Sequence, residues 1–209
     1  MLKEYDIYLF DFDGTLFDTL ESSIYVFEEA YCRIGVSIDR DKILGYTREP
    51  IPNSYKRVMG SMDGYPAFIK SIDELVFSDK VTNMAEIYSD TASTIEELKK
   101  QGKVVGIVTS NAKSHIIDVL NRFDLTKYFD IIVGNREAPV PKPSPEPILK
   151  ALELLKYKGN KNRVIYVGDS LNDAIAAKNA GISPLLIDRL NEFKDSGYPV
   201  IDSLDEIIR

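Results

Sequence analysis

The stretch "DFDGTLFDT", residues 11–19, decides the fold of this chain. Two aspartates, Asp11 and Asp13, lie two positions apart and directly follow an apolar run at residues 5–10, which predicts a buried strand. Carboxylates this close repel each other, so the pair needs either a positive partner or the open surroundings of a turn. The Gly-Thr pair that follows is typical of a turn, so this stretch alone leaves both interpretations open.

The composition is that of an ordinary globular protein. The chain has 209 residues, which suits one large domain, or one domain that carries a smaller insert. With 44% hydrophobic and 28% charged residues, it can bury most of its apolar surface without disulfides or a structural metal. Its formal net charge of −7 argues against a protein that binds nucleic acid, which needs a basic excess. Anionic substrates stay possible, because a single site can be locally positive.

The single cysteine and the single histidine are both expected to be structural. Cys32 has no second cysteine to pair with, which is consistent with a reducing compartment, so we expect a cytoplasmic protein. Cys32 lies in a helical pattern and is expected to be a buried packing thiol. His115 falls in the first turns of another expected helix, where we expect it on the helix surface.

No targeting or membrane segment is expected. The N-terminus shows no charged leader followed by a long apolar core. No run approaches the ~20 apolar residues that a membrane span needs. The sequence therefore predicts neither a signal peptide nor a membrane partner.

The first half of the chain predicts a helical unit after the first strand. Apolar residues recur at steps of three and four from Thr19 to Ile34, which indicates an amphipathic helix that Gly35 ends. Between Ile38 and Tyr88 the helical patterns are short and interrupted by glycine and proline, and no strand is evident. This segment is therefore expected to be a small helical insert.

From residue 90 onward, strands and helices alternate. The expected helices cover residues 90–101, 112–123, 145–157 and 171–180. The expected strands cover residues 103–108, 129–133, 163–167 and 184–187. These strands are continuous apolar runs, which is typical of a parallel sheet covered by helices on both faces. The prediction is an α/β protein with a doubly wound, Rossmann-like parallel sheet.

Polar residues collect where the strands end. In such sheets, ligands bind beyond the carboxyl ends of the strands. The residues that follow four successive strands are Asp11 and Asp13, then Thr109, Ser110 and Asn111, then Lys142, and finally Asp169 and Asp173. Because parallel strands end at one edge, we expect these side chains to converge.

This set of residue types suits phosphoryl transfer. Carboxylates without histidine or cysteine ligands favour Mg²⁺, which would also relieve the repulsion between the first two aspartates. Hydroxyls and backbone N–H groups after Thr109 make an anion site, and Lys142 supplies a positive charge for phosphate. Two carboxylates two positions apart can act as nucleophile and as general acid–base. These are the parts that phosphoryl transfer requires.

Each piece also has a purely structural interpretation. Thr109 or Ser110 could cap the following helix, and Asp173 with Ser170 approaches a capping box. Lys142 lies among five alternating prolines, where a solvent-exposed lysine is the ordinary expectation. If there were no functional site, each of these structural interpretations would have to be right at the end of a successive strand. A functional site explains all of the residues at once and is therefore favoured.

With these residues in place, the chain resembles the haloacid dehalogenase superfamily, in its phosphoglycolate-phosphatase-like branch with a helical cap. The four motifs of that family match "DFDGTLFDT", Thr109 in "IVTSN", Lys142 in "KPSPE", and Asp169 with Asp173 in "GDSLNDAIAAKNAGI". They occur in the family's order. The resemblance implies a catalytic core at residues 1–17 and 85–209 and a helical cap at residues 18–84.

The resemblance also implies catalytic roles. Asp11 would be the nucleophile that forms an aspartyl-phosphate. Asp13 would protonate the leaving group and then activate water, and Lys142 would neutralise charge on Asp11 and on the phosphate. The dehalogenase members lack an acid at the position of Asp13, so its presence favours phosphate chemistry. Gly14 would let the chain turn, and Thr15 would brace the loop.

The implied binding residues fall into two groups. Thr109, Ser110 and Asn111 would hold phosphoryl oxygens together with Lys142. The Mg²⁺ ligands would be Asp11, the backbone carbonyl of Asp13, Asp169, and Asp173 through a water. In the cap, Arg48 is the expected contact to the substrate.

The expected function is a Mg²⁺-dependent phosphatase for a small phosphorylated metabolite, such as phosphoglycolate, in a monomer or weak homodimer. A sugar-phosphate mutase is an alternative, which the absence of histidine in "TLESSIYVFEEAY" disfavours. A pyrophosphatase and a 5′-nucleotidase are further alternatives on the same scaffold. A non-catalytic binding protein is least expected, because every motif acid is present.

Overall fold

The computed structural model describes residues 4–47 and 50–208. The chain divides into two compact units, one formed by Met1–Asp18 with Ile87–Arg209 and the other by Thr19–Glu86. We call them the core unit and the helical unit. In the described part of the chain, no helix has both the length and the apolar character needed to cross a membrane.

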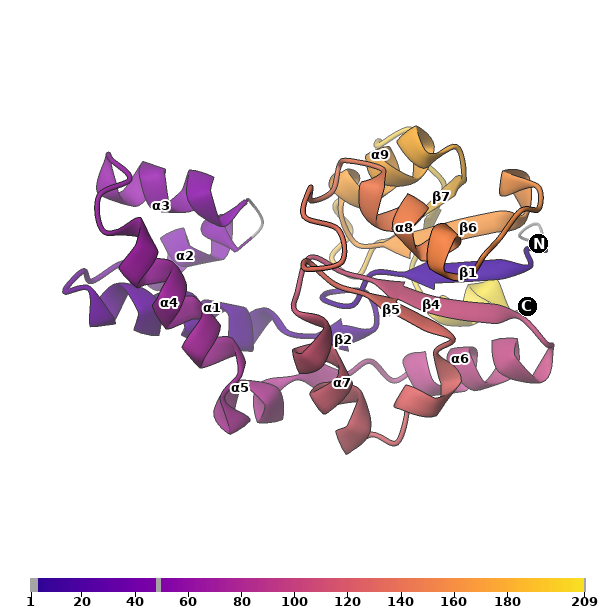
Figure 1. The fold of residues 1–209 in the computed structure, drawn as a ribbon, viewed down its shortest axis with the longest axis horizontal. Coiled ribbons are helices and arrows are strands. Elements are labelled where there is room, and N and C mark those ends of the chain that lie inside the picture. The colour runs from indigo at the N-terminus through magenta and orange to yellow at the C-terminus, as the bar shows by residue number, and fades with distance from the viewer. Residues whose placement is uncertain (1–3, 48–49, 209) are drawn as a thin grey trace. The chain divides into compact units, whose positions relative to one another are not determined.

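The core unit is built on a six-stranded parallel sheet (Figure 1). Its strands are β1 (Ile7–Phe10), β4 (Val104–Val108), β5 (Ile131–Val133), β6 (Val164–Gly168), β7 (Ser183–Ile187) and β8 (Val200–Ile201). Their order in the sheet is β5-β4-β1-β6-β7-β8, and each neighbouring pair is parallel. The doubly wound α/β prediction is confirmed, with β1 at the centre of the sheet.

Helices cover both faces of this sheet. They are α6 (Thr91–Lys100), α7 (Lys113–Arg122), α8 (Glu146–Leu154) and α9 (Leu171–Ala180). Figure 1 shows α8 and α9 over one face and α6 and α7 over the other. Short 3₁₀ helices occur at Thr126–Tyr128, Lys161–Arg163 and Leu204–Ile207. The four expected helices are confirmed, three of them slightly shorter than the sequence predicted.

Gly106 shows why the centre of the sheet is packed so closely. It lies in β4 between Leu9 of β1 and Ile131 of β5, its partners in register on either side. A Cβ atom on Gly106 would lie 2.5 Å from Ile131 Cγ2 and 2.8 Å from Leu9 Cδ2. The missing side chain therefore leaves room for two larger apolar ones. Burial of a leucine of this kind contributes roughly 1.5–3 kcal/mol.

The helical unit has its own core. It contains α1 (Leu20–Arg33), α2 (Arg40–Tyr46), α3 (Ile51–Met59), α4 (Tyr65–Val76) and α5 (Asp79–Met84). The fully buried rings of Tyr31, Tyr55 and Phe68 meet at its centre, with the Tyr31 and Phe68 ring centroids 4.4 Å apart. The helix ending at Gly35 matches the expectation, since that glycine has φ +78° just after α1.

Three two-residue strands were not expected from the sequence, and one of them is β8. β2 (Phe17–Asp18) pairs with β3 (Glu86–Ile87) in a separate two-stranded sheet. β3 therefore contradicts the expectation that no strand lies between Ile38 and Tyr88. Two residues are too few to show a period-two pattern, so the sequence carries no signal for them.

The expectations for the two single residues were wrong. Cys32 is exposed, because the buried stripe of α1 runs through Phe27, Ala30 and Tyr31 and leaves position 32 outside it. His115 is only 4% exposed, because it lies one turn before Val119 on the buried face of α7. Burial lowers the pKa of His115, so its imidazole is neutral at pH 7.

Candidate active site

The strand register brings the two central motifs to one edge of the sheet. Phe10, the last residue of β1, lies beside Ile107 of β4 and Val167 of β6. The next residue, Asp11, donates its backbone N–H to the carbonyl of Val167 at 2.8 Å. The strand order reverses between β1 and β6, which is where doubly wound sheets bind ligands. Asp11 and Asp169 directly follow these two strands, so both residues lie where the strand order reverses.

Lys142 is the positive centre of the site. Its Nζ lies 2.8 Å from Asp11 Oδ2 and 2.7 Å from Asp173 Oδ1, and it donates to the Tyr166 hydroxyl at 2.9 Å. The lysine is 9% exposed, so the structure excludes the solvated lysine that the prolines suggested. Burial alone would lower the pKa of Lys142, but the two carboxylates outweigh it and hold that pKa well above its ordinary value.

Asp173 caps a helix and also contacts Lys142. Its Oδ2 accepts hydrogen bonds from the Ser170 backbone N–H at 3.1 Å and the Ser170 hydroxyl at 2.5 Å, completing a capping box at the start of α9. Its Oδ1 contacts Lys142. One oxygen of this carboxylate therefore caps α9, and the other contacts the lysine of the candidate site.

Three carboxylates meet in a group that suits a cation. Asp11, Asp169 and Asp173 each offer an oxygen within 4.8 Å of the others. Burial raises the pKa of Asp11 well above its usual value, although Lys142 opposes this rise. Burial, followed by repulsion from Asp173, raises the pKa of Asp169 to about 7. One lysine does not balance three carboxylates, so hard oxygen donors and surplus negative charge fit a divalent cation such as Mg²⁺.

Two glycines allow this close approach. Gly14 has φ +69°, and a Cβ on it would lie 2.1 Å from Asp169 Oδ2. A Cβ on Gly168 would lie 2.4 Å from the Cβ of Asp173. The loop after β1 thus passes directly beside Asp169, and the half-buried Asp13 immediately precedes that closest point.

The residues after β4 form a turn in front of α7. Thr109 is buried, and its hydroxyl accepts a hydrogen bond from the Asn111 backbone N–H at 3.1 Å. Asn111 Oδ1 accepts from the backbone N–H of Ala112 at 2.8 Å, whereas Ser110 is exposed. Because Ala112 is the N-cap residue of α7, neither Thr109 nor Ser110 caps that helix.

Tyr166 connects this turn to Lys142 and was not predicted from the sequence. The tyrosine lies in β6, is 1% exposed, and donates its hydroxyl proton to the carbonyl of Val108 at 2.7 Å. The same oxygen accepts from Lys142. Burial raises the pKa of Tyr166 well above its usual value, so the phenol keeps its proton. A phenol inside an apolar strand needs a partner when buried, which was the available signal in "RVIYV".

Two predicted residues need separate mention. Arg48 lies outside the described residues. Thr15 takes part in the loop through its backbone, because its carbonyl accepts a hydrogen bond from Arg189 Nη2 at 2.9 Å. The Thr15 hydroxyl, by contrast, is buried with no hydrogen-bond partner among the described residues.

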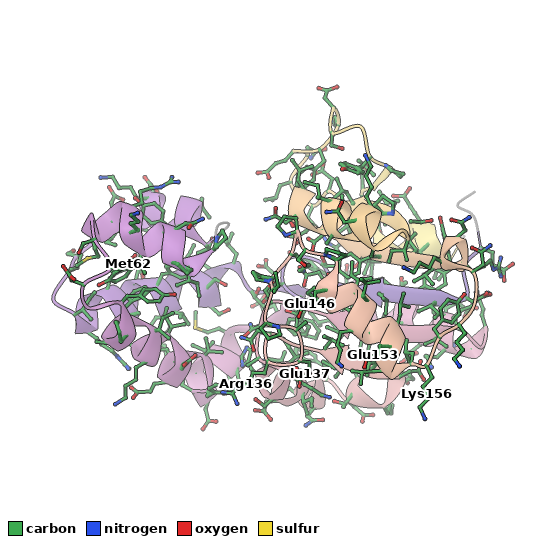
Figure 2. All side chains as sticks on the ribbon, turned by 45° about the horizontal axis from the view of Figure 1, so that its top comes forward. Met62, Arg136, Glu137, Glu146, Glu153 and Lys156 are labelled. Carbon is green, nitrogen blue, oxygen red and sulfur yellow. The ribbon has the colours of Figure 1, made fainter. Side chains whose placement is uncertain are left out.

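A second concave region is lined by more acidic than basic residues. A hollow of about 390 Å³ runs along α8 and is lined in part by Glu137, Glu146 and Glu153, which Figure 2 labels. Lys150 is the single cation in its lining. This surplus of carboxylates disfavours phosphate, so the hollow is not a candidate anion site.

Comparison with known sequences identifies relatives across the core. A family model described as haloacid dehalogenase-like hydrolase matches residues 8–187, which include every strand-end residue described above. A protein named "Putative pyrophosphatase PpaX" from Caldanaerobacter subterraneus subsp. tengcongensis is 32% identical over 185 residues. The alignment covers 86% of this chain and 80% of that protein.

Solved structures show the same architecture. A "Putative haloacid dehalogenase-like hydrolase" from Bacteroides fragilis has a TM-score of 0.86 and 29% identity, over 98% of this chain and 100% of that chain. A "Putative Phosphatase" from Clostridium difficile has a TM-score of 0.82 and 28% identity, with each chain covered completely.

Proposed function

This chain belongs to the haloacid dehalogenase-like hydrolase family and is a phosphatase, and from that premise we propose that it hydrolyses a small phosphorylated metabolite with Mg²⁺ as cofactor. One observation carries the proposal. A single buried ammonium, that of Lys142, contacts Asp11 and Asp173 in a group of three carboxylates at the switch point of the sheet. Carboxylate oxygens beside a fixed positive charge are the parts that bind Mg²⁺ and a phosphoryl group together.

Asp11 is the proposed nucleophile. Its Oδ1 accepts a hydrogen bond from the Phe12 backbone N–H at 2.8 Å, and its Oδ2 contacts Lys142. Both contacts fix the orientation of the carboxylate. One of its oxygens bonds to phosphorus while the ester bond breaks, which gives an aspartyl-phosphate and the free leaving group.

Asp13 is the proposed general acid and base. It delivers a proton to the leaving oxygen in the first step. It then accepts a proton from the water that attacks phosphorus, which releases phosphate and restores Asp11. The position of Asp13 beside Gly14, where the loop approaches Asp169, supports this role.

The remaining strand-end residues are proposed to bind charge. Asp11, Asp169, Asp173 and the backbone carbonyl of Asp13 would hold the cation, which when bound neutralises negative charge on the carboxylates and on phosphate. Asp173 already contacts Ser170 and Lys142, which supports a contact through water. Thr109, Ser110 and Asn111 are proposed to donate to the phosphoryl oxygens, and Lys142 is proposed to supply positive charge beside them.

The helical unit is proposed to be a cap that selects the substrate, and Arg48 its contact to the substrate. Its insertion into the chain directly after β2 and before β3 supports this assignment. Caps of this kind exclude water and choose the leaving group. We further propose a cytoplasmic monomer or weak homodimer, which light scattering on the purified protein will test.

Pyrophosphate is a second candidate substrate beside a phosphoglycolate-like ester. The observation that favours it is the name of the relative at 32% identity, a pyrophosphatase. Both substrates present a terminal phosphoryl group to the same residues, so the site residues described do not separate them. A sugar-phosphate mutase and a 5′-nucleotidase have no comparable support.

The test is phosphate release from a panel of pyrophosphate, phosphoglycolate, a sugar phosphate and a nucleoside monophosphate, each with Mg²⁺. We expect release from at least one of them, and loss of activity in a chelator that fresh Mg²⁺ reverses. Asp11→Asn is expected to lower kcat by about a thousandfold or more, because the amide cannot attack phosphorus. The exposed Asp195→Asn is the matched control and should behave as wild type. Equal turnover by Asp11→Asn and wild type would refute the assigned nucleophile.

A further inference from the structure

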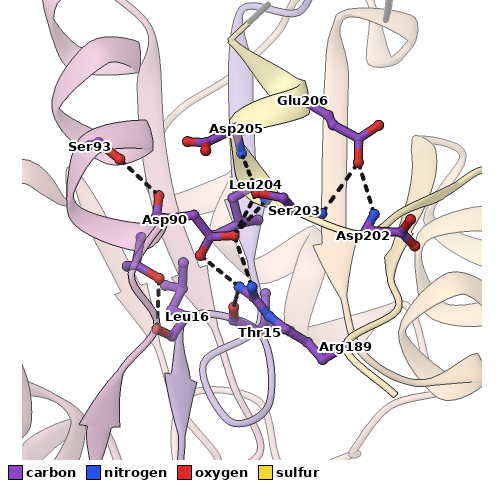
Figure 3. A network of polar contacts seen from close by, with 11 residues as sticks. Thr15, Leu16, Asp90, Ser93, Arg189, Asp202, Ser203, Leu204, Asp205 and Glu206 are labelled. Atoms are coloured by element: carbon purple, nitrogen blue, oxygen red, sulfur yellow. Dashed lines mark hydrogen bonds and ion pairs between the residues drawn. The ribbon is translucent and has the colours of Figure 1, made fainter. Parts of the chain in front are cut away.

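A buried polar network lies beside the loop that carries Asp13 (Figure 3). Its centre is Asp90, which immediately precedes α6 and is 7% exposed. Asp90 Oδ1 accepts from Arg189 Nη2 at 3.0 Å, and Oδ2 accepts from Arg189 Nη1 at 2.8 Å. Oδ2 also accepts from the Ser203 hydroxyl at 3.0 Å and the Leu204 backbone N–H at 2.9 Å. We call Asp90, Arg189, Ser203 and Leu204 the Asp90 network.

Arg189 extends this network to the backbone of the loop. The same Nη2 that contacts Asp90 donates to the Thr15 carbonyl at 2.9 Å. Its guanidinium carbon lies 3.9 Å from the centre of the Tyr88 ring, so an aromatic face also supports it. Arginine suits this position, because its planar group can contact a carboxylate with two nitrogens and still reach a carbonyl.

The loop between β1 and β2 is held at two successive carbonyls. Beside the Thr15 contact, the Leu16 carbonyl accepts from the Thr91 hydroxyl at 2.8 Å and from the Tyr88 backbone N–H at 3.3 Å. The loop also bonds within itself, because the Gly14 N–H donates to the Phe17 carbonyl at 2.8 Å and the Leu16 N–H donates to the Phe12 carbonyl at 3.0 Å. Contacts from outside the loop therefore act together with these internal bonds to fix the direction of the Thr15 and Leu16 carbonyls.

This direction matters because the loop has no spare room at Gly14. The Gly14 backbone passes so close to Asp169 that a Cβ would lie 2.1 Å from its Oδ2. Rotation of the Thr15 peptide would move Gly14 and, one residue earlier, Asp13. An error of about 1 Å in a catalytic group can cost about a hundredfold in rate.

We propose that Arg189, held in orientation by Asp90, is a positioning residue that fixes the Thr15 carbonyl and so the placement of Asp13. The inference rests on the proposed role of Asp13 as general acid and base. It gives the Asp90 network a function in turnover in addition to its contribution to stability.

The structure supplies a matched control for its test. Arg163 contacts both carboxylate oxygens of Asp6 at 3.0 and 2.5 Å, and it donates to the Glu4 backbone carbonyl at 3.0 Å. It thus repeats the pattern of Arg189, one carboxylate plus one carbonyl. Asp6 and Arg163 directly precede β1 and β6, so this pair lies at the sheet edge opposite the site. Arg163 is more exposed than Arg189.

The experiment compares Arg189→Met, Arg189→Lys and Arg163→Met with wild type. Hydrogen exchange is measured at the amides of Gly14, Leu16 and Phe17, and hydrolysis of p-nitrophenyl phosphate is measured with Mg²⁺ well below the unfolding temperature. We expect Arg189→Met to exchange these amides about tenfold faster and to lower kcat about 10- to 100-fold, with KM within about twofold. Arg163→Met should leave both measurements within about twofold of wild type.

Arg189→Lys separates positioning from stability. Lysine keeps the positive charge beside Asp90 but cannot contact it with two nitrogens while also holding the Thr15 carbonyl. We expect it to recover much of the thermal stability that Arg189→Met loses, yet little of the kcat. A purely structural arginine would instead give wild-type kcat in both variants at a temperature where each is folded.

The outcomes distinguish the two claims. Unchanged exchange at the three amides in Arg189→Met would overturn the inference, as would faster exchange with unchanged kcat. A wild-type protein that hydrolyses neither this ester nor the substrate panel would defeat the proposed function, and the role of Arg189 in turnover with it. In that case the exchange rates still decide whether Arg189 holds the loop.

Discussion

At the scale of the single residue, Lys142 organises the site through its three hydrogen-bond donors. Two of them contact carboxylates, and the third contacts the Tyr166 hydroxyl, which in turn donates to the carbonyl of Val108. The lysine cannot rotate without breaking one of these contacts. Its charge is therefore fixed in position before any substrate binds, and fixed charges stabilise developing charge without reorganisation.

Tyr166→Phe tests this arrangement by removal of one oxygen atom. Lys142 would lose an acceptor and Val108 its side-chain donor, so we expect kcat to fall about tenfold with little change in KM. We also expect the protein to lose about 1–3 kcal/mol of stability, because the buried Val108 carbonyl would lose its hydrogen bond from Tyr166. Steady-state kinetics and urea unfolding measure the two effects.

Tyr8→Phe is the control for that variant. Tyr8 is also a buried tyrosine in a central strand, and its hydroxyl accepts a hydrogen bond from the Tyr5 backbone N–H at 3.3 Å. Its loss should affect stability and leave kcat unchanged. Equal kcat for Tyr166→Phe and Tyr8→Phe would show that the Tyr166 hydroxyl does not position Lys142.

At the scale of the element, the loop between β1 and β2 is constrained in two ways at Gly14. Positive φ at Gly14 and the proximity of Asp169 are two separate constraints on the same residue. The first concerns the backbone alone, and the second concerns the neighbouring carboxylate. The chain contains another glycine that has the first constraint without the second, so the two can be measured apart.

Gly14→Ala is expected to impair the site far more than Gly35→Ala. Both glycines have positive φ, at +69° and +78°, so each alanine carries a backbone cost of about 1–2 kcal/mol. Only at Gly14 does the added Cβ meet Asp169, whereas nothing lies within 4 Å of it at Gly35. We expect kcat to fall at least about a hundredfold in Gly14→Ala and to be unchanged in Gly35→Ala. Similar kinetics in the two variants would mean that the loop can move away from Asp169.

The elements themselves were largely predictable from the sequence. Long apolar strands and amphipathic helices have strong periodic signals, so the doubly wound sheet and the four core helices were found. The acids after β1 and β6 were found because parallel strands end at one edge. The two-residue strands β2 and β3 have no such signal, and the burial of His115 depends on which face of α7 meets the core.

Tyr166 and Arg189 show what the sequence hides at the site. Each acts through one contact with a backbone carbonyl, at Val108 and at Thr15. A backbone carbonyl is present at every position, so no residue type marks which one is used. Only the folded chain shows that these side chains reach the site loops.

At the scale of the whole core unit, the Asp90 network joins segments that are far apart in the chain. Asp90 precedes α6, Arg189 follows β7, and Leu204 begins the C-terminal 3₁₀ helix. Arg189 also contacts Thr15 of the first loop. Burial alone would raise the pKa of Asp90. The hydrogen bonds from Arg189 and from the Leu204 backbone outweigh burial and lower that pKa below its usual value.

This lowered pKa predicts a pH-dependent contribution to stability. A carboxyl whose pKa is lower in the folded than in the unfolded state stabilises the fold above its unfolded pKa, and that contribution is lost as pH falls through the folded pKa. Asp90→Asn should therefore unfold several degrees below wild type at pH 7. In a chain of this size, each kcal/mol of stability lost lowers the melting temperature by about 2–4 °C. The gap should narrow at pH 3, as measured by circular dichroism. Asp195→Asn serves as the exposed control, and a gap that is equal at both pH values would contradict this account.

The central place of β1 has a consequence for synthesis. β1 leaves the ribosome before both of its neighbours, β4 and β6, and the whole helical unit emerges in between. Until β6 has emerged, the apolar segment IYLF has at least one open edge that can pair with another nascent chain. Truncated chains that end before residue 164 keep this edge open and should therefore aggregate.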